Sequence, residues 1–384
     1  MDVEVPGAVG RVLDGLLHGR LAEAEAIDAT FARDVAERLA RFTLGGGKRT
    51  RSQFLWWGLR SCGDAADVDS ALRLAAALEL IQTCALVHDD VMDGSPTRRG
   101  GRAVHTEIAD QYQSVPGRRE RESFARSAAI LVGDLALAWA DDLVADTVLS
   151  PEVRRRVYGI WRAMKTEMVA GQYLDLHGKA NGSRSTAQAI RTACLKSALY
   201  SVERPLAMGA ALASADRRTT RALRSAGRCA GIAFQLRDDI LGVFGDPART
   251  GKPSGEDIRQ GKPTYLVAVA RARAEANGDR ASVTVLESAF GDARLSEDGL
   301  ARVRSVLVAT GARATVEKKI ARLMANSTRH LDRGTFEPAA LQRLHGLLYT
   351  VAGLPPAVAA PSGRLGDGPP VSPLLVTSTD AGKP

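Results

Sequence analysis

Two acidic motifs, far apart in the sequence, carry the residue types that could do chemistry. The first contains Asp89, Asp90 and Asp93, and the second contains Asp238 and Asp239. Asp89 and Asp93 are four residues apart, which places both carboxylates on one face of a helix. Neighbouring carboxylates repel one another and need positive charge beside them. Because oxygen-only ligands suit Mg²⁺, the two motifs together predict a magnesium site that takes a phosphate-rich substrate.

Two basic motifs could supply the cations that such a substrate needs. A triple glycine, Gly45–Gly47, is followed by Lys48 and Arg51. Exposed backbone N–H groups and nearby cations can cradle an anion, although a flexible turn with surface charges has the same composition. Arg98 and Arg99 follow the first acidic motif, and guanidinium groups bind phosphate in a bidentate way. A solvated basic loop is the alternative for this pair.

Further polar residues recur at helical spacing between the acidic motifs. Gln172 and Asp175 are three apart, and Lys196 and Tyr200 are four apart. Phosphate contact and an ordinary surface position are both open for Lys196. Gln235 precedes the two acids of the second motif by three and four residues, so all three side chains can face one site.

Long helices must position these side chains. The first acidic motif closes an apolar run over residues 72–87, and the second ends a helix predicted for residues 222–244. In the first run, apolar residues recur at the spacing of a mostly buried helix, at Leu74, Leu78, Ile81 and Ala85. Aromatic residues make up only 5% of the chain, which favours helix over sheet.

Length and composition restrict the remaining possibilities. Four scattered cysteines without a CxxC pair fit a reduced cytoplasm, with neither a zinc site nor a disulfide framework. The best candidate for a membrane span, residues 71–87, contains Arg73 and Glu79, and the N-terminus lacks the basic start of a signal peptide. The net charge of +8 suggests nucleic acid, but no recognition motif accompanies it, so we expect no nucleic-acid partner.

Taken together, these residues resemble the trans-isoprenyl diphosphate synthase (polyprenyl synthetase) family over roughly residues 40–350. The resemblance rests on motifs that fall in the family's order: Gly46-Gly47-Lys48 with Arg51; Asp89-Asp90 with Asp93, Arg98 and Arg99; Gly171-Gln172 with Asp175; Lys196-Ser197; Phe234-Gln235 with Asp238-Asp239; and Gly261-Lys262. It implies an all-α fold, a single large helical bundle around a deep central cavity, with the acidic motifs facing each other across the cavity mouth. It also implies a homodimer.

The resemblance assigns roles by position. Asp89 and Asp93, supported by Asp90, resemble magnesium ligands on the allylic diphosphate, and Asp238, beside Asp239, resembles the ligand of the remaining magnesium, with three ions when substrate is bound. The cations around the allylic diphosphate would be Arg98, Lys196, Lys252 and Lys262. The isopentenyl diphosphate site would contain Lys48, Arg51, Gln82 and Arg99. The residues that steady the reacting centre would be Gln172, Ser197, Tyr200 and Gln235.

The chain departs from the family pattern at three positions. Gly242 stands where the second acidic motif usually has its last aspartate, and Asp246 lies too far along the helix to replace it. We therefore expect one firm metal ligand on this side, Asp238. The family often has histidine at the position of Gln82 and threonine at that of Ser197, whose hydroxyl can still serve.

The helix before Asp89 should act as a ruler for the growing prenyl chain, since one helical turn of about 5.4 Å is roughly one isoprene unit. Cys84 and Ala85 are small, so the tail should pass this level and be stopped lower, by Leu78, Ile81 or partner helices. The alternative is that these four residues are ordinary core. This predicts geranylgeranyl diphosphate as the product. Farnesyl and longer polyprenyl diphosphates are the alternatives.

Other classes of protein fit the sequence less well. A class I terpene cyclase shares the fold and first acidic motif, but the acid pair Asp238-Asp239 and the cations Lys48 and Arg51 argue against it. A non-catalytic partner subunit would usually lose the acidic motifs. We divide the chain into an N-terminal helical segment (1–40), a catalytic domain (41–353) and a tail (354–384) whose Gly-, Pro- and Ser-rich composition predicts disorder.

Overall fold

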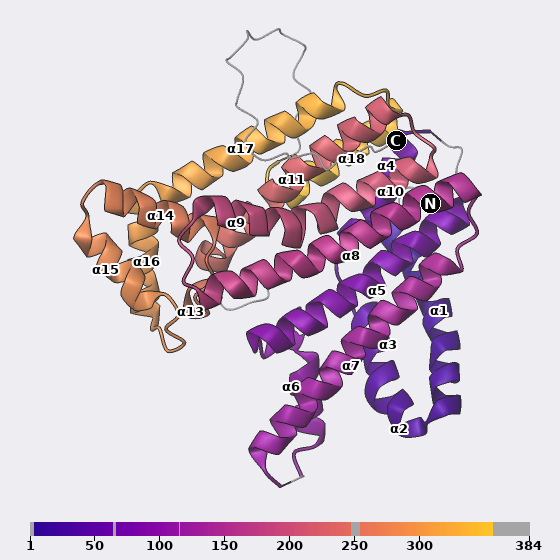
Figure 1. The fold of residues 1–384 in the computed structure, drawn as a ribbon, viewed down its shortest axis with the longest axis horizontal. Helices are drawn as coiled ribbons and strands as arrows, with labels where there is room; N and C mark the ends of the chain where they lie inside the picture. The colour runs from indigo at the N-terminus through magenta and orange to yellow at the C-terminus, as the bar shows by residue number, and fades with distance from the viewer. Residues whose placement is uncertain (1–3, 64–66, 115, 247–253, 356–384) are drawn as a thin grey trace, which may run out of the picture.

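The computed structural model describes residues 4–63, 67–114, 116–246 and 254–355. Lys252 and nearly all of the predicted tail lie outside these ranges. The described chain folds into helices, which confirms the all-α prediction (Figure 1). The helices of its first part are α1 (Val5–Ile27), α2 (Ala29–Phe31), the π-helix η1 (Ala32–Ala36), α3 (Glu37–Leu44), α4 (Thr50–Ser61), α5 (Val68–Asp93), α6 (Val104–Gln111) and α7 (Arg118–Ala145). The later ones are α8 (Pro151–Ala180), α9 (Thr186–Ala193), the π-helix η2 (Cys194–Glu203), α10 (Arg204–Leu212), α11 (Arg217–Phe244), α13 (Glu256–Arg259), α14 (Tyr265–Ala276), α15 (Arg280–Ala289), α16 (Glu297–Ala309), α17 (Ala312–Leu331) and α18 (Pro338–Val351).

Helix α5 is the predicted buried helix, and it carries the first acidic motif at its C-terminal end. Asp67 caps its start by accepting hydrogen bonds from the N–H groups of Asp69 and Ser70, and Gly94, with φ +63°, ends it in the left-handed conformation. By length and composition α5 could cross a membrane, but 78% of its apolar window is buried within the fold. It is therefore described best as the core helix of a bundle.

Neighbouring helices hold α5 and the second acidic helix in place. Helices α4 and α7 pack against α5, while α17 and η2 pack against α11. Figure 1 shows α7 running beside α5, with α14 to α16 gathered at one end of the bundle. The second acidic motif lies near the end of α11, as the sequence predicts.

The π-helix η2 lies between α8 and α11, and two glycines permit its close approach. A Cβ at Gly171 of α8 would lie 2.3 Å from the backbone nitrogen of Lys196, and one at Gly231 of α11 would lie 2.6 Å from Ala198 Cα. Since real Cβ atoms keep clear of backbone at such distances, only glycine fits here. The π-helix η2 carries Lys196 and Tyr200. Short π-helical segments within α-helices are frequent at functional sites.

A buried acid fixes the C-terminal end of η2. Glu203 is fully buried, and its carboxylate accepts hydrogen bonds from Arg224 Nε at 3.0 Å and Arg228 Nε at 2.7 Å. Arg204 lies 3.7 Å from the same carboxylate and also pairs with Glu167 of α8. This network joins η2 to both flanking helices.

The loop after α5 contains a small element that the sequence reading did not predict. Strands β1 (Thr97–Arg98) and β2 (Gly101–Arg102) form an antiparallel hairpin in which Thr97 pairs with Arg102. Its turn consists of Arg99 and Gly100, both with positive φ. In this hairpin Arg98 is buried, with 9% of its surface exposed, whereas Arg99 lies on the exposed outer side.

Candidate active site

A single cavity of about 490 Å³ collects polar residues from helices far apart in the sequence. Its wall comes from α4, α5, β1, α8, α9, η2, α11, the start of α14 and the segment that leads into α14. Its charged and amide side chains are Arg51, Gln82, His88, Asp89, Arg98, Gln172, Asp175, Lys196, Gln235, Asp238, Asp239 and Lys262. Both acidic motifs therefore contribute to one hollow, as the sequence predicts.

Asp89 lies at the centre of the positive charge in this cavity. Its carboxylate accepts hydrogen bonds from Lys196 Nζ at 3.0 Å, Arg98 Nη2 at 3.1 Å and Gln172 Nε2 at 3.3 Å. Burial alone would raise the pKa of Asp89, but the charges of Lys196 and Arg98 outweigh it and hold this pKa well below its usual range. The group is therefore an anion at neutral pH.

The other two acids of the first motif have cations of their own. Asp90 is 1% exposed and accepts hydrogen bonds from Arg98 Nε, at 2.8 and 3.1 Å to its two oxygens, so that it faces the hairpin rather than the cavity. Asp93 accepts a hydrogen bond from Lys179 Nζ of α8 at 2.6 Å. The repulsion expected among the three acids is thus relieved by cations of the protein itself.

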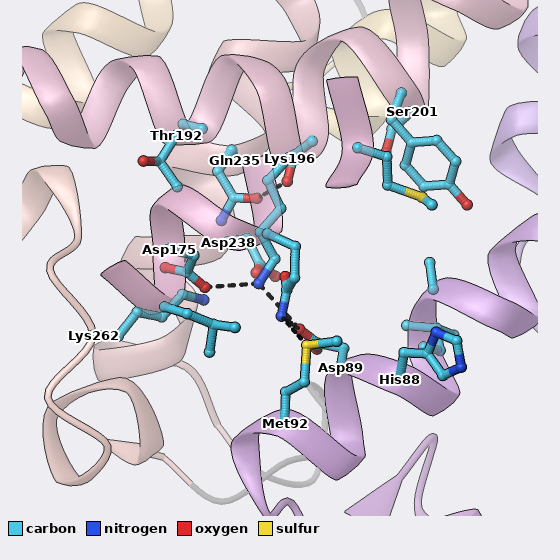
Figure 2. A pocket seen from close by; sticks show the side chains of 18 of the residues that line it. His88, Asp89, Met92, Asp175, Thr192, Lys196, Ser201, Gln235, Asp238 and Lys262 are labelled. Atoms are coloured by element: carbon cyan, nitrogen blue, oxygen red, sulfur yellow. Dashed lines mark hydrogen bonds and ion pairs between the residues drawn. The ribbon is translucent and has the colours of Figure 1, made fainter. Parts of the chain in front are cut away.

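Lys196 joins the first acidic motif to α8. Its ammonium group donates to Asp175 Oδ2 at 2.7 Å as well as to Asp89, and Figure 2 shows it lying between the two carboxylates. Burial would lower the pKa of Lys196, yet Asp89 and Asp175 together raise it. Lys196 therefore lines the cavity and is not an ordinary surface residue; phosphate contact stays a prediction.

The two acids of the second motif have different surroundings. Asp238 is exposed and lines the cavity mouth, whereas Asp239 is 4% exposed and accepts a hydrogen bond from Gln235 Nε2 at 2.9 Å. The hydroxyl of Ser197 donates to the Oε1 atom of the same glutamine. Burial raises the pKa of Asp239 to about 7. Asp238 is therefore the accessible carboxyl group of this motif.

The structure adds an acid that the sequence analysis did not assign. A Cβ at Gly242 would lie 2.5 Å from Asp257 Oδ2, so the carboxylate of Asp257 occupies the space beside the position where the family's last aspartate is missing. Lys262 Nζ lies 3.5 Å from Asp257 Oδ1, and Asp257 is the main cause of a strongly raised pKa of Lys262. The glycine at 242 was the signal that could have prompted a search for a nearby acid.

A second basic region adjoins the cavity. The guanidinium of Arg51 lies 4.4 Å from the ring centroid of Tyr200 and donates to Ser201 Oγ at 2.8 Å. Tyr200 in turn donates to Gln82 Oε1 at 2.6 Å. Arg51 Nε is buried and has no acceptor among the described residues, which leaves a donor for a ligand.

The glycine-rich loop beside this region has the backbone of an anion-binding turn. Gly46 and Gly47 have φ of +126° and +117°, and Arg49, at φ +45°, begins α4 without a side-chain cap. Lys48 and Arg99 lie on the exposed outer side of this loop and are not part of the cavity wall.

Apolar side chains also line the cavity, namely Cys84 and Ala85 of α5, Met168 and Leu176 of α8 and Phe234 of α11. Leu78 and Ile81, predicted as possible stops, are fully buried and lie outside the cavity wall. Both belong to the hydrophobic core, in which α5 packs against α4 and α7.

A polyprenyl synthetase family model matches residues 33–306, which is more than half of the chain. The chain belongs to the polyprenyl synthetase family. Among solved structures it is similar to geranylgeranyl pyrophosphate synthase from Corynebacterium glutamicum, complexed with isoprenyl diphosphate and magnesium, with 37% identity and a TM-score of 0.86 over 91% of this chain and 98% of that one.

Characterised polyprenyl synthetases that resemble the chain differ in their products. Geranylfarnesyl diphosphate synthase of Aeropyrum pernix is 33% identical over 70% of this chain and 77% of the relative. A (2E,6E)-farnesyl diphosphate synthase of Mycobacterium tuberculosis is 30% identical over 75% of this chain and 72% of the relative. Membership of the family therefore establishes a prenyltransferase and leaves its product open.

Proposed function

We propose that this polyprenyl synthetase condenses isopentenyl diphosphate head-to-tail with allylic diphosphates and that geranylgeranyl diphosphate is its main product. The observation that carries the proposal is the convergence of Asp89, Asp238, Lys196 and Lys262 on one cavity that apolar side chains also line. The charged side chains suit a diphosphate, and the apolar ones suit a prenyl chain.

The carboxylates fit magnesium that arrives with the substrate. Asp89, Asp93 and Asp238 offer the oxygen donors that Mg²⁺ prefers. Among the described residues no three acidic, histidine or cysteine side chains converge closely enough to hold a metal ion by themselves. We therefore infer that the substrate diphosphate and water complete the coordination. When bound, Mg²⁺ stabilises the negative charge that builds on the leaving diphosphate.

The cations of the chain bind the allylic diphosphate. Arg98, Lys196 and Lys262 line the cavity mouth and can donate to its oxygens, which lowers the barrier to breaking the allylic C–O bond. We expect Lys252 to join them. Lys196 must exchange part of its contact with Asp89 for the substrate, and Asp175 keeps it in place meanwhile.

Isopentenyl diphosphate would be held on the other side by Lys48, Arg51, Gln82 and Arg99, with its double bond directed at the allylic carbon. Holding both reactants at contact distance turns the encounter of two free molecules into a reaction within one complex, which lowers the entropic part of the barrier. The apolar wall keeps water from trapping the carbocation. Gln172 and Gln235 line the cavity close to Asp89 and Asp239 and would steady the reacting centre.

The proposed product follows from two small side chains of the cavity wall. Cys84 and Ala85 line the cavity, and we infer that their small size lets a prenyl chain extend past them. We further propose a cytoplasmic homodimer, for which exposed apolar side chains on α7, Phe124 and Leu131, offer a surface. The four cysteines are free, in keeping with a reduced compartment.

The test is a condensation assay on the purified protein with Mg²⁺, isopentenyl diphosphate and, in turn, dimethylallyl, geranyl or farnesyl diphosphate. Products are dephosphorylated and sized by chromatography. A main product of geranylgeraniol supports the proposal, and farnesol or longer alcohols would correct the product. A hydrocarbon released without consumption of isopentenyl diphosphate would indicate a terpene cyclase instead.

A further inference from the structure

The backbone at Arg99 is in a conformation that its side chain does not favour. Arg99 and Gly100, with φ of +53° and +77°, form the two-residue turn of the β1–β2 hairpin. Two-residue turns with positive φ at both positions strongly prefer asparagine, aspartate or glycine at the first. An arginine there carries backbone strain, and strain of this kind is often found where a side chain has a functional role.

The side chain of Arg99 reaches back to α3 and to the glycine-rich loop. Its guanidinium lies 5.0 Å from the ring centroid of Phe42, and Nη1 donates to the Phe42 carbonyl oxygen at 3.1 Å. A Cβ at Gly47 would lie 3.3 Å from Arg99 Nη2, so the bare glycine leaves room for the guanidinium beside the loop. Two contacts with Phe42 and the space beside Gly47 thus fix the position of one cation.

These contacts hold the charge of Arg99 without neutralising it. In the part of the chain that the structure describes, no carboxylate forms an ion pair with Arg99, whereas Arg98 pairs with both Asp89 and Asp90. Partial desolvation of the guanidinium by its neighbours lowers the pKa of Arg99, the charge of Glu79 opposes this shift, and the neighbouring charge of Arg51 adds to it. Arg99 therefore adds to a positive region on the side of the cavity where Arg51 lies.

We propose that Phe42 is a positioning residue: its ring holds Arg99 beside the glycine-rich loop, where the guanidinium binds the diphosphate of isopentenyl diphosphate. The inference rests on the proposed function and deepens it, since it names a residue that acts through another. The ring face attracts the cation and leaves its outward N–H groups free for a ligand. An aliphatic side chain fills the same space but offers no such attraction.

The experiment compares Phe42→Leu with Phe42→Trp by steady-state kinetics, varying each substrate at saturation of the other. Because an exposed cation–π contact is weak, Phe42→Leu should raise the KM for isopentenyl diphosphate about two- to fivefold. The KM for the allylic diphosphate and kcat should stay within experimental error of the wild type. Phe42→Trp should keep the wild-type KM. Phe31→Leu, a change at another partly buried phenylalanine of the N-terminal helices, is the matched control and should alter neither KM.

A double-mutant cycle tests the coupling directly. In an Arg99→Ala background, Phe42→Leu should cause no further rise in the KM for isopentenyl diphosphate. An additive rise, an equal rise in both KM values, or a wild-type KM in Phe42→Leu would overturn the inference. Phe42→Met provides a second non-aromatic variant should the leucine variant fold poorly. Absence of condensation by the wild-type protein would refute the proposed function itself, which is a separate outcome.

Discussion

Because α8 and η2 are in close contact at Gly171, adding one methyl group at this position should lower both kcat and the stability of the fold. In Gly171→Ala the new Cβ would lie 2.3 Å from Lys196 N, 2.6 Å from Lys196 Cα and 2.7 Å from the Leu195 carbonyl carbon. Ordinary van der Waals contact begins at 3.4 Å. All three atoms belong to the backbone, so no side-chain rotation relieves the overlap, and η2 must move by about 1 Å.

This shift would displace the ammonium group that contacts Asp89 and Asp175. Because a misplacement of about 1 Å in a catalytic group costs roughly 10²-fold in rate, we expect kcat to fall by about that factor. Overpacking should also lower the free energy of unfolding by about 1–3 kcal/mol. The assay is kcat at saturation of both substrates, well below each variant's melting temperature, together with urea unfolding.

Gly159→Ala is the matched control on the same helix. A Cβ at Gly159 has nothing within 4 Å, so this variant should keep the wild-type kcat and gain roughly 0.5–1 kcal/mol of stability from the better helix former. If Gly171→Ala instead retained the kcat and stability of the wild type, α8 and η2 would not be in the contact described, and the placement of Lys196 would be wrong.

Four other changes have defined outcomes. Glu203→Gln leaves three arginines without their carboxylate and should lower the free energy of unfolding by about 3–5 kcal/mol. Burial would raise the pKa of Glu203, but the arginines outweigh burial and hold the pKa in the folded state below its usual 4.5. The charged carboxylate therefore stabilises the fold at pH values above the pKa of the unfolded state. This stabilisation is lost as the pH falls through the pKa of the folded state. The difference in urea unfolding between wild type and variant should shrink below about pH 4.5; a constant difference down to pH 3 would contradict the pairing. Asp90→Asn weakens the hydrogen bonds that hold Arg98 in place. It should raise the KM for the allylic diphosphate by roughly tenfold and the KM for isopentenyl diphosphate by less. Equal changes in both KM values would argue against a role of Asp90 in positioning Arg98. Ala85→Phe should shorten the main product, sized by chromatography, and an unchanged length would place the ruler elsewhere. Removal of divalent metal with EDTA should abolish condensation until Mg²⁺ is restored, and metal-independent turnover would refute the magnesium proposal.

The parts of the fold that follow from local patterns could be predicted from the sequence. Helix α5 ends where the acidic motif meets Gly94, and the apolar spacing before it correctly predicts burial of Leu74 and Leu78. Spacing also predicts that Asp89 and Asp93 share a face of the helix, because a helix fixes which residues lie on one side, but only Asp89 lines the cavity. These inferences need no knowledge of what the helix packs against.

Contacts between distant segments could not be predicted in the same way. Nothing in the residue pattern shows that Asp90 turns to Arg98 while Asp89 faces the cavity, since the hairpin that carries Arg98 determines the pairing. The carboxylate of Asp257 reaches the space beside Gly242 only through the packing of α13 on α11. The packing of distant helices also decides that Ile81 lies in the hydrophobic core and not on the cavity wall.

The structural test of the central claim, that Asp89 and Asp238 together hold a metal-bound diphosphate above an apolar pocket, is anomalous diffraction from crystals soaked with Mn²⁺ and the unreactive thiolo analogue of geranyl diphosphate. The account predicts manganese peaks beside the carboxylates of Asp89 and Asp93 and beside that of Asp238, with the diphosphate between them and the prenyl chain directed toward Ala85. Manganese that contacts neither α5 nor α11, or a diphosphate bound outside this cavity, would contradict it.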